Sequence, residues 1–90
     1  MIIRWETFAD EDLVVGDKEA VAAIYEVSIR TVERHCAPLY RMPKEGLPRG
    51  QSGAAIYDLL GAERDLEGVA PRAKASALQL RIRMERHYLT

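Results

Sequence analysis

Apolar positions recur at helical spacing in two neighbouring segments of the first half of the chain. Residues 18–25 are rich in alanine and place their apolar side chains on one helical face, behind Asp17 as a candidate N-terminal cap. Residues 29–36 continue at the same period behind a second candidate cap, Ser28, and Pro38 ends that segment. The pattern predicts two short helices joined by a turn.

The pattern changes in the second half of the chain. Residues 39–42 and 54–57 are predicted as two short strands that pair antiparallel. The segment 43–53 contains two prolines and three glycines, which is the composition of a loop. Further apolar residues at helical spacing predict a helix over 59–66 and a final helix over 72–88.

The N-terminal segment has no clear period. It is predicted as an irregular arm or a short helix, with Trp5 and Phe8 leaning on the core. Asp58 is the expected cap of the helix that follows the second strand. The fold class predicted is mainly α with a small β-hairpin. Its expected parts are an N-terminal arm or short helix (1–15), a domain of helices and hairpin (16–68) and a C-terminal helix (69–90).

Composition narrows the class of protein. Ninety residues are enough for one small domain, and the longest apolar run is far shorter than the roughly 20 residues of a membrane helix. The first residues lack the pattern of a signal peptide. A single cysteine, Cys36, excludes an intramolecular disulfide and a cysteine-cluster zinc site, and we expect it in the core. We therefore expect a cytoplasmic protein with no membrane partner.

Charge is arranged in alternating blocks beneath a net charge of −1. Residues 1–26 carry two positive and seven negative side chains, whereas residues 27–52 carry five and two. Residues 53–70 are again acidic, and residues 71–90 are basic with five positive side chains and one negative. Because nucleic acid is attracted by local rather than total charge, the two basic blocks remain candidates for its binding.

The predicted helix pair resembles the helix-turn-helix of MerR and excisionase proteins, whose members read roughly A-x-x-(apolar)-G-V-S-x-R-T-V-x-R. The matching residues are Ala22, Tyr25, Val27, Ser28, Arg30, Thr31, Val32 and Arg34. Glu26 stands where the family usually has glycine, so the turn is either wider or left-handed at some energetic cost. The hairpin downstream resembles a wing, and the likeness to a winged helix-turn-helix covers residues 16–66.

The resemblance implies sequence-specific binding of double-stranded DNA by a small phage- or mobile-element-type regulator. Its role would be that of a transcriptional repressor or of an excisionase-like recombination directionality factor, with an integrase as a candidate partner. Arg30, Thr31 and Arg34 would enter the major groove, and Ser28 would contact phosphate. The wing would contact phosphates or the minor groove through Arg41, Lys44, Arg49 and Gln51. Glu33 would either accept a hydrogen bond from cytosine or pair with a neighbouring arginine.

Two other interpretations stay open. The same fold could serve as a protein-interaction module, for instance a phage adaptor or inhibitor that binds no DNA. The helix over 72–88 is apolar on more than one face, so it either packs on the chain's own core or supports a homodimer or cooperative oligomer on DNA through Leu80, Met84 and Tyr88.

No phosphate loop, nucleophile motif or metal-ligand spacing occurs, so we expect no enzyme, no cofactor and no metal.

Overall fold

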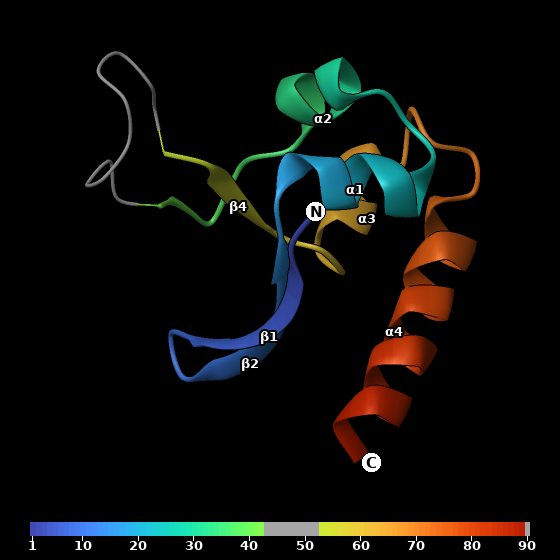
Figure 1. The fold of residues 1–90 in the computed structure, drawn as a ribbon. Helices are drawn as coiled ribbons and strands as arrows, with labels where there is room; N and C mark the ends of the chain where they lie inside the picture. The colour runs from blue at the N-terminus through green and yellow to red at the C-terminus, as the bar shows by residue number, and fades with distance from the viewer. Residues whose placement is uncertain (43–52, 90) are drawn as a thin grey trace.

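The computed structural model describes residues 1–42 and 53–89, with side chains up to Arg86. It is an α+β protein in which helices cover a four-stranded antiparallel sheet of order β1-β2-β4-β3 (Figure 1). This arrangement corrects the predicted fold class of a mainly α protein with a small hairpin wing. The elements are β1 (Ile3–Phe8), β2 (Glu11–Gly16), α1 (Lys18–Tyr25), α2 (Ile29–His35), β3 (Tyr40–Arg41), β4 (Ala55–Asp58), α3 (Ala62–Leu66) and α4 (Ala73–Leu89).

The N-terminal segment is a β-hairpin, so the arm or short helix predicted for residues 1–15 is wrong. β1 and β2 pair along their whole length, from Ile3 opposite Gly16 to Phe8 opposite Glu11. The two turn residues, Ala9 and Asp10, both have positive φ, at 51° and 67°. Such a two-residue turn matches the twist of the strands it joins, although glycine and asparagine are its usual residues.

The predicted hairpin of β3 and β4 is confirmed, but it is half of a larger sheet. Tyr40 lies opposite Ile56 across that pair. β4 also pairs with β2, where Gly16 lies opposite Tyr57. A Cβ at Gly16 would lie 2.2 Å from the carbonyl oxygen of Ile2, so only glycine fits at this point. β2 and β4 therefore join the two hairpins into one sheet.

The helices cover one face of the sheet and form the main core with it. From β2 and β4, Val14 and Tyr57 point into this core. The helices contribute a buried set that comprises Ala20, Val21, Tyr25, Val32, Ala62, Leu66, Ala73, Ala77, Leu80 and Met84. In α4 these residues recur every three or four positions, so one stripe of that helix faces inward. Of the two alternatives for this helix, Leu80 and Met84 follow packing on the chain's own core rather than self-association, since they are only 3% and 8% exposed, and the Tyr88 side chain lies outside the described part.

On the opposite face of the sheet, side chains from the two edge strands contact each other. The Tyr40 hydroxyl donates to the carboxylate of Glu6, at 2.7 Å from the nearer oxygen, and accepts from Arg4 at 3.3 Å. The ring of Phe8 stacks on that of Tyr40, with centroids 6.1 Å apart. Because β1 and β3 lie at opposite ends of the strand order, these contacts require a strongly curved sheet.

Candidate nucleic-acid interface

α1 and α2 meet at a tight left-handed turn. The Asp17 carboxylate accepts from the Ala20 amide at 3.0 Å and caps α1, as predicted. Glu26 caps the C-terminal end of α1, and its backbone is left-handed with φ 55° and ψ 45°. The Val27 amide then donates to the Ala22 carbonyl at 3.1 Å. Of the two alternatives for a turn without glycine, the structure therefore has the left-handed one, which a residue with a Cβ adopts at a cost.

α2 is anchored by its cap and by two buried side chains. Ser28 Oγ accepts from the Thr31 amide at 3.1 Å and lies 2.9 Å from Thr31 Oγ1, which confirms Ser28 as the cap. Val32 is fully buried and Cys36, which follows the helix, is also in the core as predicted. Burial raises the pKa of the Cys36 thiol to about 11, with the carboxylate of Asp65 adding to the shift. The core contacts hold α2 in one orientation on the domain.

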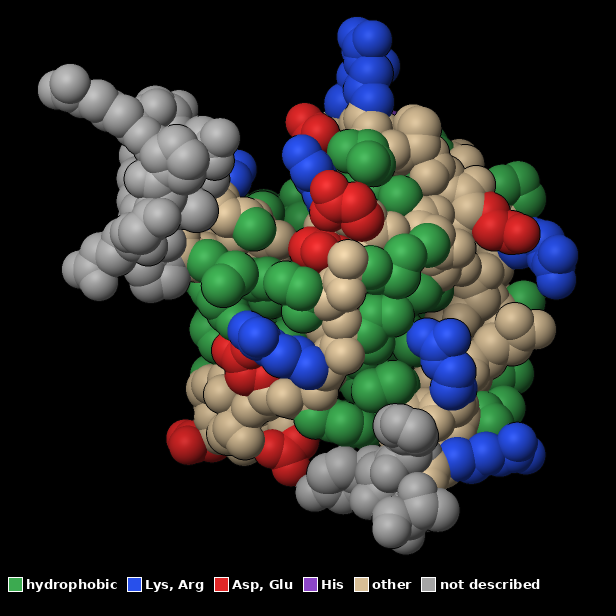
Figure 2. Space-filling model, viewed as in Figure 1, with side chains coloured by type: hydrophobic (Ala, Val, Ile, Leu, Met, Phe, Trp, Pro, Cys, Tyr) green, Lys and Arg blue, Asp and Glu red, His purple; other side chains and the backbone are tan. Residues whose placement is uncertain are grey.

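The outer side of α2 presents Arg30 and Arg34. Both side chains are exposed and, four residues apart, they lie on one helical face away from Val32. Neither forms an ion pair or a side-chain hydrogen bond with any part of the chain that the structure describes. In Figure 2, Lys and Arg side chains project at the top of the view over α2, with acidic side chains below them over α1.

Of the two alternatives for Glu33, pairing with a neighbouring arginine is not what the described residues show. Glu33 pairs instead with Lys18 at the start of α1, with Nζ and Oε1 3.5 Å apart and both side chains exposed. An exposed pair of this kind contributes little to stability, but it keeps the carboxylate of Glu33 on the side of α2 that faces α1. Sequence reasoning missed Lys18, because no local spacing brings it next to a residue in the following helix.

Among the residues expected on the wing, Arg41 is the one whose position the structure describes. It lies on β3, is exposed, and donates from Nη1 to the Gly53 carbonyl at 3.4 Å. Arg41 and Glu33 line one hollow, so β3 and α2 are neighbours on the surface. Lys44, Arg49 and Gln51 lie outside the described residues. The candidate residues brought together on one helix are therefore Ser28, Arg30, Thr31 and Arg34.

Other kinds of site find no support in the described residues. Within 1–42 and 53–89, no three His, Cys, Asp or Glu side chains gather closely enough to hold a metal ion. Over the same ranges, no helix has the length and apolar character needed to cross a membrane.

Comparison with known proteins gives no match to the chain. No family model matches it, and no curated protein and no solved structure does either. What the chain can bind must therefore be inferred from the geometry of α2 and its surroundings.

Proposed function

We propose that the protein binds double-stranded DNA through the solvent-facing side of α2. The observation that carries this proposal is the pair Arg30 and Arg34, two exposed guanidinium groups on one face of a helix that is fixed to the core from behind. An arginine held in this way can donate two hydrogen bonds to the O6 and N7 atoms of guanine in the major groove. Because neither group has a partner in the described chain, neither must break an ion pair to reach a base.

The shape of the site suits the major groove. A helix enters that groove, which is about 12 Å wide, when its outer side is unobstructed, and α2 carries exposed side chains along that side. Thr31 lies next to the two arginines and offers a hydroxyl near the start of the helix, where it lies 2.9 Å from Ser28 Oγ. Arg41 on the neighbouring strand would contact a phosphate, and Lys44, Arg49 and Gln51 remain sequence-based expectations for the same role.

Acidic side chains limit the area that can face DNA. Glu19, Glu26 and Glu33 are exposed around the two-helix unit, and Glu33 is held toward α1 by Lys18. Phosphates would be repelled from these positions, since salt at ordinary concentration screens the repulsion between like charges only beyond about 8–10 Å. The contact is therefore expected to be small and to depend strongly on the two arginines of α2.

Binding to a labelled duplex over a salt series tests the proposal. Fluorescence anisotropy with a random-sequence duplex of about 20 base pairs should show affinity falling linearly on a log–log plot, with a slope of several units. Arg30→Ala and Arg34→Ala should each weaken binding, whereas Arg64→Ala, an exposed arginine on α3, serves as the matched control. Absence of binding at the lowest salt, or equal losses in all three variants, would contradict the proposal.

We also propose that the protein recognises a specific DNA sequence, as a transcriptional repressor or a recombination directionality factor. Selection of bound fragments from genomic DNA would supply a specific site, and on that site Arg30→Ala or Arg34→Ala should cost about 1–3 kcal/mol if the arginine reads a base. A bend in the bound site, together with joint binding of an integrase, would favour a recombination directionality factor. A straight site that overlaps a promoter would favour a transcriptional repressor.

A further inference from the structure

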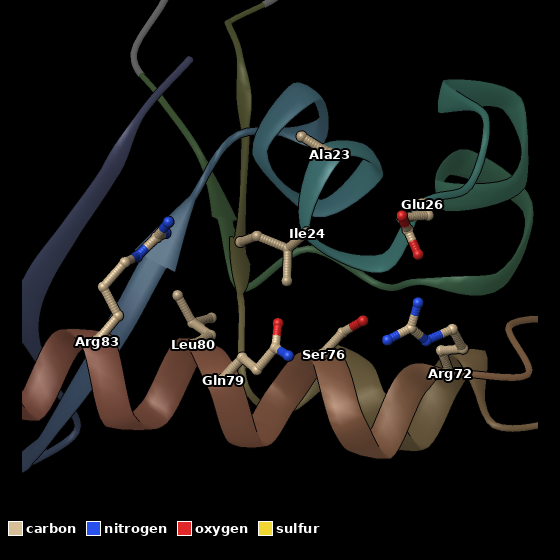
Figure 3. Close-up of a pocket in the computed structure, with 8 residues that line it drawn as sticks. All are labelled: Ala23, Ile24, Glu26, Arg72, Ser76, Gln79, Leu80 and Arg83. Atoms are coloured by element: carbon tan, nitrogen blue, oxygen red, sulfur yellow. The ribbon is translucent and has the colours of Figure 1, made fainter.

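A groove of about 360 Å³ runs between α1 and α4 (Figure 3). In Figure 1, α4 lies on a different side of the domain from α2. Its apolar surface comes from Ala23 and Ile24 of α1, because Leu80 of α4 is only 3% exposed. Polar side chains stand along its length from α4, and Glu26 lies at one end. An apolar floor between polar walls is the usual composition of a binding groove.

Four polar residues of the α4 segment share the face that lines this groove. They are Arg72, Ser76, Gln79 and Arg83, and their spacing of four, three and four residues places them in one row. Figure 3 shows Arg83 at one end of the groove and Arg72 at the other, with Ser76 and Gln79 between them. The row spans about 16 Å, since eleven residues of helix rise about 1.5 Å each.

Arg72 and Arg83 both line the groove. Across the described residues, neither Arg72 nor Arg83 forms an ion pair, although the carboxylate of Glu26 faces Arg72 across the end of the groove. A guanidinium binds a carboxylate through two parallel hydrogen bonds. Between the arginines, a hydroxyl and an amide can exchange hydrogen bonds with a peptide backbone, while the floor can accept apolar side chains.

We propose that this groove binds an extended acidic peptide segment of a partner protein. Two carboxylates of the segment pair with Arg72 and Arg83, and the apolar side chains between them rest on Ala23 and Ile24. An extended chain covers about 3.3–3.6 Å per residue, so the two acidic residues stand about five positions apart. A phosphodiester backbone would leave the apolar floor without a complementary surface, which is why a peptide is the better occupant.

Glu26 allows a test of the charge of the bound segment. Its carboxylate competes with the ligand for Arg72 and repels the ligand's own acidic group at that end. Glu26→Gln removes this charge and keeps the size of the side chain, so the variant should bind the acidic segment several-fold more tightly. A site for a basic or neutral segment would be weakened or left unchanged by the same substitution.

The test uses the full chain and two labelled hexapeptides, Glu-Leu-Ala-Leu-Ala-Glu and the same sequence with both Glu replaced by Gln. Anisotropy should show about ten-fold tighter binding of the acidic peptide, since a charged hydrogen-bonded pair is worth about that factor. Arg72→Ala and Arg83→Ala should each lose most of this preference. Arg81→Ala, an exposed arginine of α4 that does not line the groove, should keep it. Circular dichroism of each variant verifies the fold.

Four results of the binding experiments would overturn the proposal, and a fifth could come from sedimentation. They are equal affinity for the two peptides, an equal loss in the Arg81 control, and weaker or unchanged binding in Glu26→Gln. The fourth is that unlabelled duplex displaces the peptide from the unmodified chain but not from Arg72→Ala or Arg83→Ala. That result would assign the groove to nucleic acid. Sedimentation of the chain alone provides the remaining comparison. If the chain associates with itself as its concentration rises, and Arg72→Ala and Arg83→Ala abolish that association, then the occupant of the groove is a second copy of the chain. Its acidic β1–β2 turn would then take the place of the partner's acidic segment.

Discussion

The hydroxyl of Tyr25 donates a 2.6 Å hydrogen bond to the backbone carbonyl of Leu59. Tyr25 ends α1 and Leu59 directly follows β4, so the bond joins segments 34 residues apart in the chain. Both residues are buried. This contact fixes the end of α1 on the sheet and with it the turn from which α2 starts.

Replacing Tyr25 by Phe should lower the free energy of unfolding by about 1–3 kcal/mol, because the buried carbonyl of Leu59 loses its donor. Burial also raises the pKa of the Tyr25 hydroxyl well above its usual value. The stability that this group contributes is therefore complete below about pH 10, the pKa of an unfolded tyrosine, and is lost as pH rises beyond it. Urea unfolding from about pH 7 to 11 should show a shallower alkaline loss in the variant. Identical slopes would show that Tyr25 does not ionise with the unfolding transition.

Replacing Glu26 by Gly should stabilise the protein by up to about 1 kcal/mol. The left-handed backbone at this position costs a residue with a Cβ about 1–2 kcal/mol, and glycine avoids this cost. Part of the gain is offset because glycine also has greater conformational freedom in the unfolded chain. Glu26→Ala removes the same carboxylate without relieving the backbone, so it is the matched control. Thermal unfolding should rank the glycine variant above the alanine variant. The reverse order would mean that the turn relaxes without glycine.

The turn of the N-terminal hairpin offers an independent test of backbone strain. Asn and Gly are the preferred residues of a two-residue turn with positive φ, and here the positions hold Ala9 and Asp10. The double substitution Ala9→Asn, Asp10→Gly should raise the free energy of unfolding by about 1 kcal/mol. A control with alanine at both positions should not. If the asparagine–glycine chain is no more stable in urea than the control, the hairpin closes with a different turn in solution.

The two sides of α4 should respond differently to truncation of a leucine. Leu80 lies in the core, so Leu80→Ala should cost about 2–5 kcal/mol. Leu78 is 57% exposed, and Leu78→Ala should change stability by no more than about 0.5 kcal/mol. Ending the chain after Ala75 removes Ala77, Leu80 and Met84 from the core and should unfold it. Similar costs at positions 78 and 80 in chemical denaturation would mean that α4 is not docked as described.

Local chemistry made the helical part of the fold predictable. Asp17 and Ser28 are caps because their side chains satisfy amides in their own first turn, which requires no knowledge of distant residues. Asp58 was expected to begin the next helix directly, but it accepts from the Gly61 amide and α3 starts only at Ala62. The position of Arg30 and Arg34 on one exposed face followed from their spacing for the same local reason.

Beyond the β3–β4 hairpin, the sheet was not predictable from the same signals. β1 is rich in β-branched and aromatic residues, which favour strands, and this signal was available. Its turn, however, lacks the glycine that usually marks a hairpin, and β2 begins with two acidic residues before its apolar run. The pairing of β2 with β4 joins segments about forty residues apart, and no local pattern indicates such a contact. The inward direction of Leu80 and Met84 likewise depends on that sheet being present.

The placement of β2 beside β4 has a consequence for the growing chain. Both helices of the proposed DNA-contacting unit are synthesised after β2 but before β4, the strand that completes the surface beneath them. Local helices form quickly, whereas contacts across long sequence separations must wait for the later segment to be made. α2 also packs against α3, so a nascent chain that stops before Leu66 holds α2 on α1 without that second contact. Incomplete translation products should therefore hold less firmly the two arginines of the proposed DNA contact.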